Sequence, residues 1–169
     1  MRHFAVMLSL LLTAPLYALG IVEEDSTLGF SVVVGTREVS GQFEDWSAKI
    51  DLEARQITVT VRTTSATTND ALLDSVLHSA AWLNSRTFPD ASFTSTEITE
   101  TSDGYLATGI LAVRDTTLPL VVMISEPEAN ERPIYMVQAT LDRTAVGMEA
   151  FADTVSQTAE ITGKIAITP

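Results

Sequence analysis

The feature that most constrains the fold of this chain is the regular alternation of apolar and polar residues after Glu24. In the first clear run, Leu28, Phe30, Val32 and Val34 are each separated by a single residue. A period of two places successive side chains on opposite faces of a β-strand, whereas an amphipathic helix repeats every three or four residues. The chain is therefore predicted to be all-β.

About eight such strands are predicted, and the short turns between them favour antiparallel pairing. Turn signals stand at Gly35-Thr36, Glu53-Ala54-Arg55, Ser102-Asp103-Gly104 and Asp115-Thr116-Thr117. Connections this short can join only antiparallel neighbours. The polar stretch 126–133 is predicted to be an exposed loop. The predicted strands cover residues 28–34, 43–52, 57–61, 91–98, 105–113, 118–125, 134–141 and 155–167.

One segment departs from this alternation and is predicted to be a short helix. Between Asp70 and Leu83 the apolar residues follow helical spacing, and Asn69 is a candidate for the N-cap. About eight antiparallel strands can close into a barrel, whose interior is either packed with side chains or holds one ligand. A two-sheet sandwich fits the same alternation, so the residues alone leave both architectures open.

The first twenty residues have the pattern of a secretory signal peptide. Arg2 precedes an apolar run from Phe4 to Leu12, and the small residues Ala18 and Gly20 offer cleavage sites. The run is shorter than the roughly twenty residues that a membrane span requires. We expect residues 1–20 to be removed after Ala18 or Gly20, and residues 21–169 to form one exported, periplasmic domain without an integral membrane span.

The charge and the missing residue types exclude several classes of function. The chain carries 10 basic and 22 acidic residues, a net charge of −12, so nucleic acid and anionic membrane surfaces would repel it. It contains no cysteine. No loop resembles a calcium, zinc or phosphate motif, so no metal or cofactor is predicted.

The one arrangement that could carry catalysis lies on the predicted helix. Asp74 and His78 are four residues apart, so the carboxylate could orient the imidazole, with Ser75 or Ser79 as a nominal nucleophile. A nucleophile and its base on one short helix rarely reach attack geometry, and no turn suggests an oxyanion hole. We therefore expect no enzymatic activity, with an exposed helix residue as the simpler interpretation of His78.

Several segments of the chain, taken in order, resemble the YceI-like polyisoprenoid-binding family. The strongest is the run from Leu83 to Ser95, which reads LNSRTFPDASFTS. The resemblance extends over nearly all of the chain after the predicted signal peptide. Its other parts are Gly41-Gln42-Phe43 in the first hairpin, Thr63 to Thr67 before the helix, Tyr105 to Leu111 with the turn Arg114 to Thr117, and Leu141 to Gly147.

The resemblance implies a fold and a function that the residues alone leave open. It implies a lipocalin-like antiparallel barrel, usually exported, whose hollow apolar interior holds a long isoprenoid lipid of the quinone or polyprenyl phosphate class without chemistry. The chain departs from the family at Val34, where many relatives carry a polar residue, and in the loop 147–153. The alternatives are an envelope interaction module that uses the barrel as a scaffold, or an enzyme acting on a bound lipid. Homodimerisation is left open.

Candidate ligand-binding residues come from the apolar faces of the predicted elements. Their assignment depends on strand register, because a slip of one residue turns a side chain to the other face. Arg86 and Arg143 are candidates for contacting a phosphate or carbonyl group near a rim, and the alternative for both is a salt bridge that holds a helix or loop. The predicted lining residues are Phe30, Val32, Leu73, Leu77, Trp82, Phe93, Leu111, Val122, Met136 and Leu141.

Overall fold

A computed structural model describes residues 20–51, 55–125, 127 and 133–168. The predicted signal peptide lies outside these residues, except for Gly20. Most of the predicted loop 126–133 and most of the connection Glu53-Ala54-Arg55 also lie outside them. Over the described part, one sheet is formed by β1 (Thr27–Val34), β2 (Arg37–Phe43), β3 (Trp46–Asp51), β4 (Gln56–Arg62), β5 (Ala66–Thr67), β6 (Asp90–Thr101), β7 (Gly104–Val113), β8 (Thr116–Ser125), β9 (Ile134–Asp142) and β10 (Thr158–Ala166). The helices are α1 (Ala71–Leu77) and the 3-10 helices η1 (Glu23–Asp25), η2 (Thr63–Ser65) and η3 (Thr144–Val146).

The strands form a single, strongly curled antiparallel sheet in the order β3-β4-β6-β7-β8-β9-β10-β1-β2-β5. All the pairings are antiparallel, and two-residue turns join β1 to β2, β6 to β7 and β7 to β8. Gly35 and Arg114 have positive φ angles of 61° and 55° in two of these turns, as tight hairpins require. The predicted all-β, antiparallel barrel type is confirmed, with β3 and β5 at the two edges of the half-barrel.

The described residues form ten strands, so the prediction of about eight was wrong. The predicted strand 43–52 is divided, with Phe43 at the end of β2 and Trp46 at the start of β3. The chain bends between them because the N–H groups of Glu44 and Asp45 donate to the carbonyl and the hydroxyl of Ser65, at 3.2 and 2.9 Å. The residues after Ser65 add the two-residue strand β5 beside β2.

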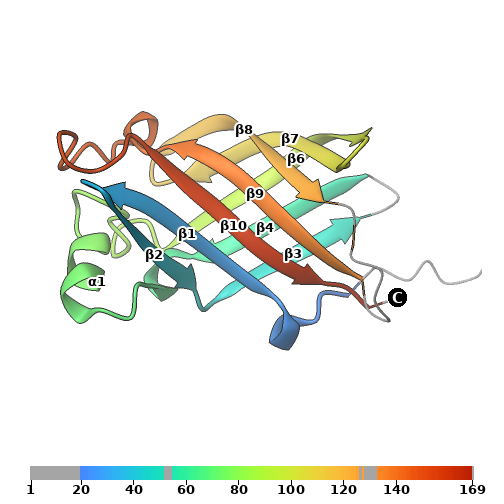
Figure 1. Cartoon of the computed structure of the whole chain (residues 1–169), viewed down its shortest axis with the longest axis horizontal. Coiled ribbons are helices and arrows are strands. Elements are labelled where there is room, and N and C mark those ends of the chain that lie inside the picture. Colours follow the sequence, from blue (N-terminus) through green and yellow to red (C-terminus); the bar gives the residue numbers. More distant parts are fainter. Residues whose placement is uncertain (1–19, 52–54, 126, 128–132, 169) are drawn as a thin grey trace, which may run out of the picture.

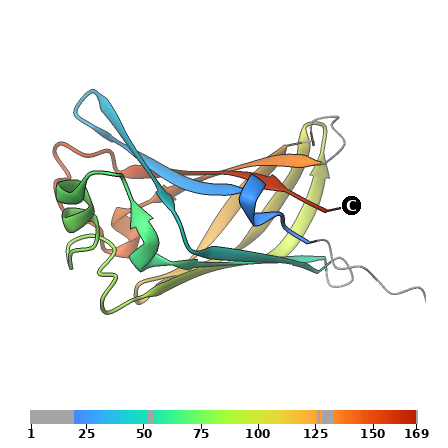
Figure 2. The ribbon, with the colours of Figure 1, turned by 90° about the horizontal axis from the view of Figure 1, so that it is seen from below.

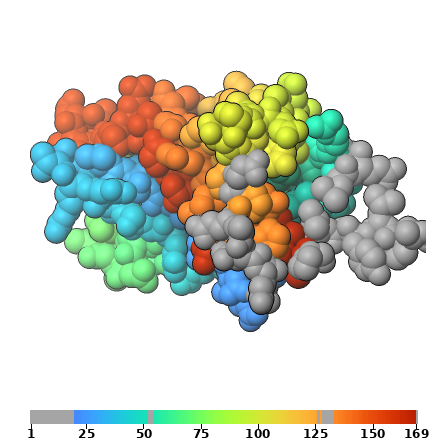
Figure 3. All heavy atoms as spheres, turned by 45° about the vertical axis from the view of Figure 1, so that its right-hand side comes forward, coloured from blue at the N-terminus to red at the C-terminus, as the bar shows by residue number. Residues whose placement is uncertain are grey.

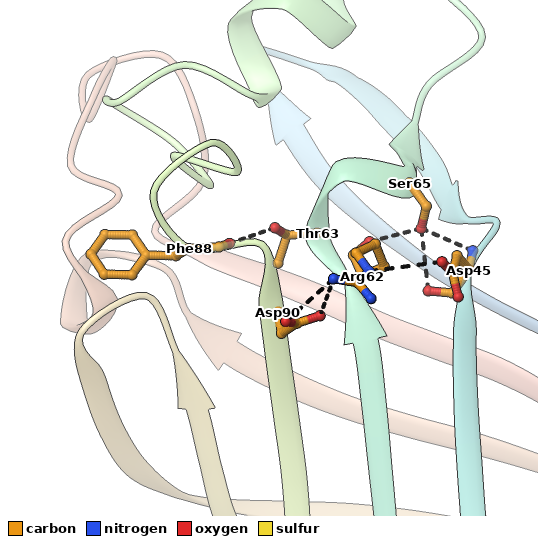
Figure 4. Close-up of polar contacts among 6 residues, drawn as sticks. All are labelled: Asp45, Arg62, Thr63, Ser65, Phe88 and Asp90. Carbon is orange, nitrogen blue, oxygen red and sulfur yellow. Dashed lines mark hydrogen bonds and ion pairs between the residues drawn. The ribbon is translucent and has the colours of Figure 1, made fainter.

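Polar contacts hold this corner, where the ends of β3, β4 and β6 meet (Figure 4). The Arg62 guanidinium lies 3.1 Å from the Asp90 carboxylate, and the Arg62 N–H donates to the carbonyl of Asp45. The Thr63 hydroxyl donates to the Phe88 carbonyl at 2.6 Å. The corner therefore fixes where β4 leaves the sheet and the chain turns toward α1.

The helix is shorter than the sequence pattern predicts. Helix α1 covers Ala71–Leu77, and beyond it the chain continues to Leu83 in turns. The N-cap is Asp70, whose carboxylate accepts from the N–H groups of Leu72 and Leu73 at 2.9 and 3.1 Å. The prediction of Asn69 as the cap was wrong by one residue, because Asn69 adopts a positive φ of 61° in the turn before the helix. No described helix has the length and apolar character of a membrane span.

The two ends of the curled sheet differ (Figures 1 and 2). At one, which we call the helix end, α1 and the connection from Arg143 to Gln157 lie across the strands. At the other, the hairpin end, β3 turns into β4 and β6 turns into β7, beside the C-terminal residues (Figure 1). The buried apolar cluster consists of residues around the helix end: Ala66, Trp82, Leu83, Val113, Leu141, Val146, Met148 and Val155.

Arg143 is the buried polar centre of the helix end. It is 1% exposed, and its Nε donates to the Ser156 carbonyl at 2.6 Å. Its Nη1 donates to the carbonyls of Met148 and Ala150, and Nη2 donates to that of Val155 at 3.0 Å. The guanidinium carbon also lies 5.1 Å from the centre of the Trp82 ring. One side chain thus fixes the whole connection against the apolar cluster.

We predict that Arg143→Met destabilises the protein by about 3 kcal/mol, because buried carbonyls that accept from a charged donor would lose their partner. Urea unfolding should show the loss, and limited proteolysis should cut the 143–157 connection first. The matched control is Arg86→Met, which removes the same group from an exposed position and should change stability by less than about 0.5 kcal/mol. Equal losses in the two variants would contradict this role.

Two carboxylates fix the loops at this end by accepting several hydrogen bonds each. The side-chain and backbone donors of Thr68, followed by the Thr67 hydroxyl, hold the pKa of Asp74 below its ordinary value of 3.8. The Thr144 hydroxyl, followed by the Gln157 amide, lowers the pKa of Asp142 in the same way. Both residues are therefore deprotonated more readily in the folded protein than in the unfolded chain.

The sign of these shifts predicts acid destabilisation. Because the folded-state pKa values lie below those of the unfolded chain, the stabilisation is complete above about pH 5 and is lost as the pH falls through the folded-state values. Asp74→Asn should lower the melting temperature at neutral pH. Between about pH 5 and pH 3, the melting temperature of this variant should decrease less than that of the wild-type protein. Thermal unfolding across this range tests it. Asp153→Asn, the same charge change at an exposed residue, should keep the wild-type pH profile.

Candidate functional site

The curled sheet encloses a cavity of about 920 Å³ that extends from the helix end to the hairpin end. This volume is near the upper limit of the usual range for small-molecule sites, about 300–1,000 Å³. The wall is built mainly from alternate residues of the strands. On β8 these are Leu120, Val122 and Ile124, and on β9 they are Tyr135, Val137, Ala139 and Leu141. The interior is therefore hollow and predominantly apolar.

Two glycines leave room for aromatic rings at the wall of the cavity. Gly41 faces Phe30 across the β1–β2 pair, and a Cβ on Gly41 would lie 2.4 Å from the Phe30 ring. A Cβ on Gly109 would lie 2.7 Å from the Phe93 ring and 2.3 Å from the Thr94 carbonyl. Both rings border the cavity. These glycines, within two of the family-like segments, therefore have a packing role.

Most of the lining residues predicted from the sequence do border the cavity. The structure brings together residues from β1, α1, β6, β7, β8 and β9, together with the turn before β6. The predicted residues on the wall are Phe30, Val32, Leu73, Leu77, Trp82, Phe93, Leu111, Val122 and Leu141. That they bind a ligand stays a prediction.

The placement of Met136 in the lining was wrong. Its side chain is 51% exposed on the outer face of β9. Met136 and Leu141 are five residues apart on one strand, and an odd spacing places two side chains on opposite faces. Since Leu141 points inward, the residues that share its face are Tyr135, Val137 and Ala139.

The two arginines proposed for a ligand's polar group are not available to it. Arg86 is exposed and does not border the cavity. Arg143 borders the cavity at the helix end, but all three of its guanidinium nitrogens donate to backbone carbonyls. Arg143 therefore holds a loop, as the alternative interpretation proposed. It does so through hydrogen bonds to backbone carbonyls, whereas that interpretation expected a salt bridge.

The side chains of Asp74 and His78, the candidate catalytic pair, have other hydrogen-bond partners. The Asp74 carboxylate accepts from Thr67 and Thr68, each at 2.7 Å. His78 Nδ1 lies 3.0 Å from the Ser85 hydroxyl, which donates to the Thr63 carbonyl. Both side chains therefore serve the local structure around α1. Within the described ranges, no three His, Cys, Asp or Glu residues are grouped as metal ligands would be.

Residues at the hairpin end of the cavity were missed by the sequence analysis. Asp51, Arg55, Gln56, Glu100 and Tyr105 all border the cavity there. The sequence gives no signal for them, because nothing in a linear sequence shows that the ends of two strand pairs meet. Strand parity, by contrast, could have found Ile124 and Val137 once Val122 and Leu141 had been assigned inward.

Known proteins share this fold and parts of this sequence. A protein of Photorhabdus laumondii, UPF0312 protein plu2095, is 28% identical over 112 residues, which cover 63% of this chain and 58% of that protein. Protein YceI of Escherichia coli O157:H7 is 34% identical over 100 residues, which cover 56% of this chain and 49% of that protein. The chain thus spans less than two thirds of the length of these curated relatives.

Two solved structures show the same fold at low sequence identity. The crystal structure of Burkholderia cenocepacia BcnA superposes with a TM-score of 0.74 at 17% identity, over 88% of this chain and 100% of that one. A polyisoprenoid binding domain from Saccharophagus degradans, implicated in plant cell wall breakdown, gives a TM-score of 0.69 at 14% identity, over 89% and 97%. The YceI-like domain matches residues 20–167, and the chain therefore belongs to the YceI-like family.

Proposed function

We propose that this protein binds a long apolar lipid of the isoprenoid class inside its curled sheet, as a carrier or store, without catalysis. The observation that carries the proposal is the cavity of about 920 Å³, which runs between the two ends of the sheet and has an almost continuous apolar wall. Each methylene that a ligand buries there contributes about 0.8 kcal/mol. A chain of isoprene units therefore needs few polar contacts to bind tightly.

Two further observations support an isoprenoid ligand and a role in binding. A structural neighbour is a polyisoprenoid binding domain, and the wall in this chain combines aromatic rings with branched aliphatic side chains, which suit a methyl-branched chain. The candidate catalytic pair, Asp74 and His78, is engaged in local hydrogen bonds. We place the protein in the periplasm after export, on the signal-like pattern of residues 1–20.

A second candidate function is an interaction module of the cell envelope. The outer face of β7, β8 and β9 carries exposed apolar side chains, namely Ile110, Val121, Met123 and Met136, each 44–51% exposed. Contiguous apolar surface on a soluble protein often marks a contact site. This function requires no ligand in the cavity, so lipid recovery distinguishes it from the first.

The direct test is native purification from the exporting host, followed by organic extraction and mass spectrometry. We expect one isoprenoid species at close to one molecule per chain, and a denatured sample controls for adventitious lipid. Protein that is recovered empty, and that also takes up no added quinone or polyprenol, would contradict lipid binding and favour the interaction module.

A matched pair of substitutions on β8 tests whether the cavity is the binding site. Val122→Trp places an indole inside the cavity and should weaken isoprenoid binding by about tenfold, because it occupies volume that the ligand needs. Val121→Trp adds the same group one residue away on the outer face and should leave affinity within about twofold. Fluorescence titration measures both. Equal affinities would place the ligand elsewhere.

A further inference from the structure

The cavity is amphipathic along its length. Its rim at the helix end is mainly apolar: Val34, Leu73, Val76 and Phe151 are 37–61% exposed and border the cavity. Thr63, Thr68 and Thr154 also border the cavity at this end, but the hydroxyl of each donates to an oxygen atom of the protein. At the hairpin end the lining includes the polar residues Asp51, Arg55, Gln56, Glu100 and Tyr105. A lipid with one polar end therefore finds charged and amide side chains for that end at the hairpin end.

At the hairpin end, the last pair of β3 and β4 lies near the last pairs of β6 and β7. Asp51 faces Gln56 across the β3–β4 pair, and Glu100 faces Tyr105 across the β6–β7 pair. Arg55 joins the two tips, since its Nη2 donates to the Ile98 carbonyl at 3.4 Å. Figure 3, which turns this end forward, shows the tip of β6–β7 in yellow beside the green-teal strands β3 and β4.

The charges at this end are unfavourable for an anion. Among the described lining residues there, the carboxylates of Asp51 and Glu100 outnumber the single cation, Arg55. The remaining lining cation, Arg143, lies at the helix end and donates to four carbonyls. The chain as a whole has a net charge of −12. A phosphate at the hairpin end would therefore meet repulsion that one guanidinium does not offset.

An uncharged polar group meets suitable partners at the same place. The Arg55 guanidinium and the Gln56 amide each donate to one backbone carbonyl of the protein, at 3.4 Å. Their further N–H groups and the Tyr105 hydroxyl can donate to a carbonyl or hydroxyl oxygen of a ligand. The Glu100 carboxylate can accept from a hydroxyl group. A neutral oxygen group also loses less hydration free energy than a phosphate when it enters the rim of an apolar cavity.

We propose, on the basis of the lipid-binding function proposed above, that this cavity selects lipids whose polar end is uncharged, such as an alcohol or a quinone, over phosphate-headed lipids. The ligand lies with its polar end beside Arg55, Glu100 and Tyr105 and its tail toward α1. Asp51 and Glu100 are the residues that determine this selection, and Arg55 opposes them.

The test compares two probes with the same tail, geranylgeraniol and geranylgeranyl monophosphate. At low ionic strength we expect the wild-type protein to bind the alcohol about tenfold more tightly than the monophosphate. The ratio should decrease as salt screens the carboxylates. Tryptophan fluorescence reports both titrations, because Trp46 and Trp82 border the cavity.

Charge-neutralising variants assign the selection to the rim. Glu100→Gln should improve monophosphate binding about threefold and leave alcohol binding unchanged, while Arg55→Gln should weaken monophosphate binding further. The matched control is Glu97→Gln, the same charge change on the same strand at an exposed residue that does not border the cavity. It should keep the wild-type ratio.

The orientation has a test of its own. In a Trp46→Phe background, Trp82 remains as the one tryptophan, and it lies at the helix end. An isoprenoid alcohol with a nitroxide at its tail should quench Trp82 more strongly than the analogue labelled beside the hydroxyl. Stronger quenching by the second analogue would overturn the orientation.

The outcomes separate this inference from the function on which it rests. If the alcohol and the monophosphate bind with equal affinity, or the monophosphate binds more tightly, the selection is overturned while lipid binding stands. If Glu100→Gln and Glu97→Gln change the ratio equally, the rim carboxylates are not its cause. If neither probe binds, the proposed function is overturned and this inference with it.

Discussion

The structure depends on how a sheet can curl around an empty apolar space and stay folded. A hollow sheet gives up the side-chain contacts that normally stabilise a protein interior. Here the buried cluster is gathered at the helix end, and Arg143 holds the connection that covers it by donating to four backbone carbonyls. Stability is thus concentrated at one end, which leaves the length of the sheet free to line a cavity.

Strand alternation explains what could be predicted from the sequence and where the prediction failed. The all-β fold and most of the wall follow from the period of two, because residues of one parity share a face. The error at Met136 arose from combining two parities on one strand. The division of the strand at Phe43 could not be predicted, because the bend depends on Ser65, about twenty residues later in the chain.

The polar rim shows the limit of sequence analysis more clearly. Arg55 and Ile98 are 43 residues apart and meet because β4 pairs with β6. On its other side, β6 pairs with β7 through a register shift between Ser95 and Glu97. An acidic turn in isolation is most simply interpreted as solvated surface. Its place at the end of an apolar cavity depends on the register of three strands, which alternation alone does not determine.

The proposed lipid binding depends on two properties, affinity for the apolar tail and selection of the polar end group. The apolar wall provides the first and the polar rim the second. Burial along the wall adds free energy for each methylene and depends little on which apolar residue supplies the surface, so the wall sets affinity through chain length. The few charged residues at the hairpin end contribute little to that binding free energy. Their net negative charge, however, repels an anionic end group and does not repel a neutral one. Because the two sets lie on different parts of the same strands, a substitution at the hairpin end is expected to change the preferred end group while the wall, and with it the fold, is retained.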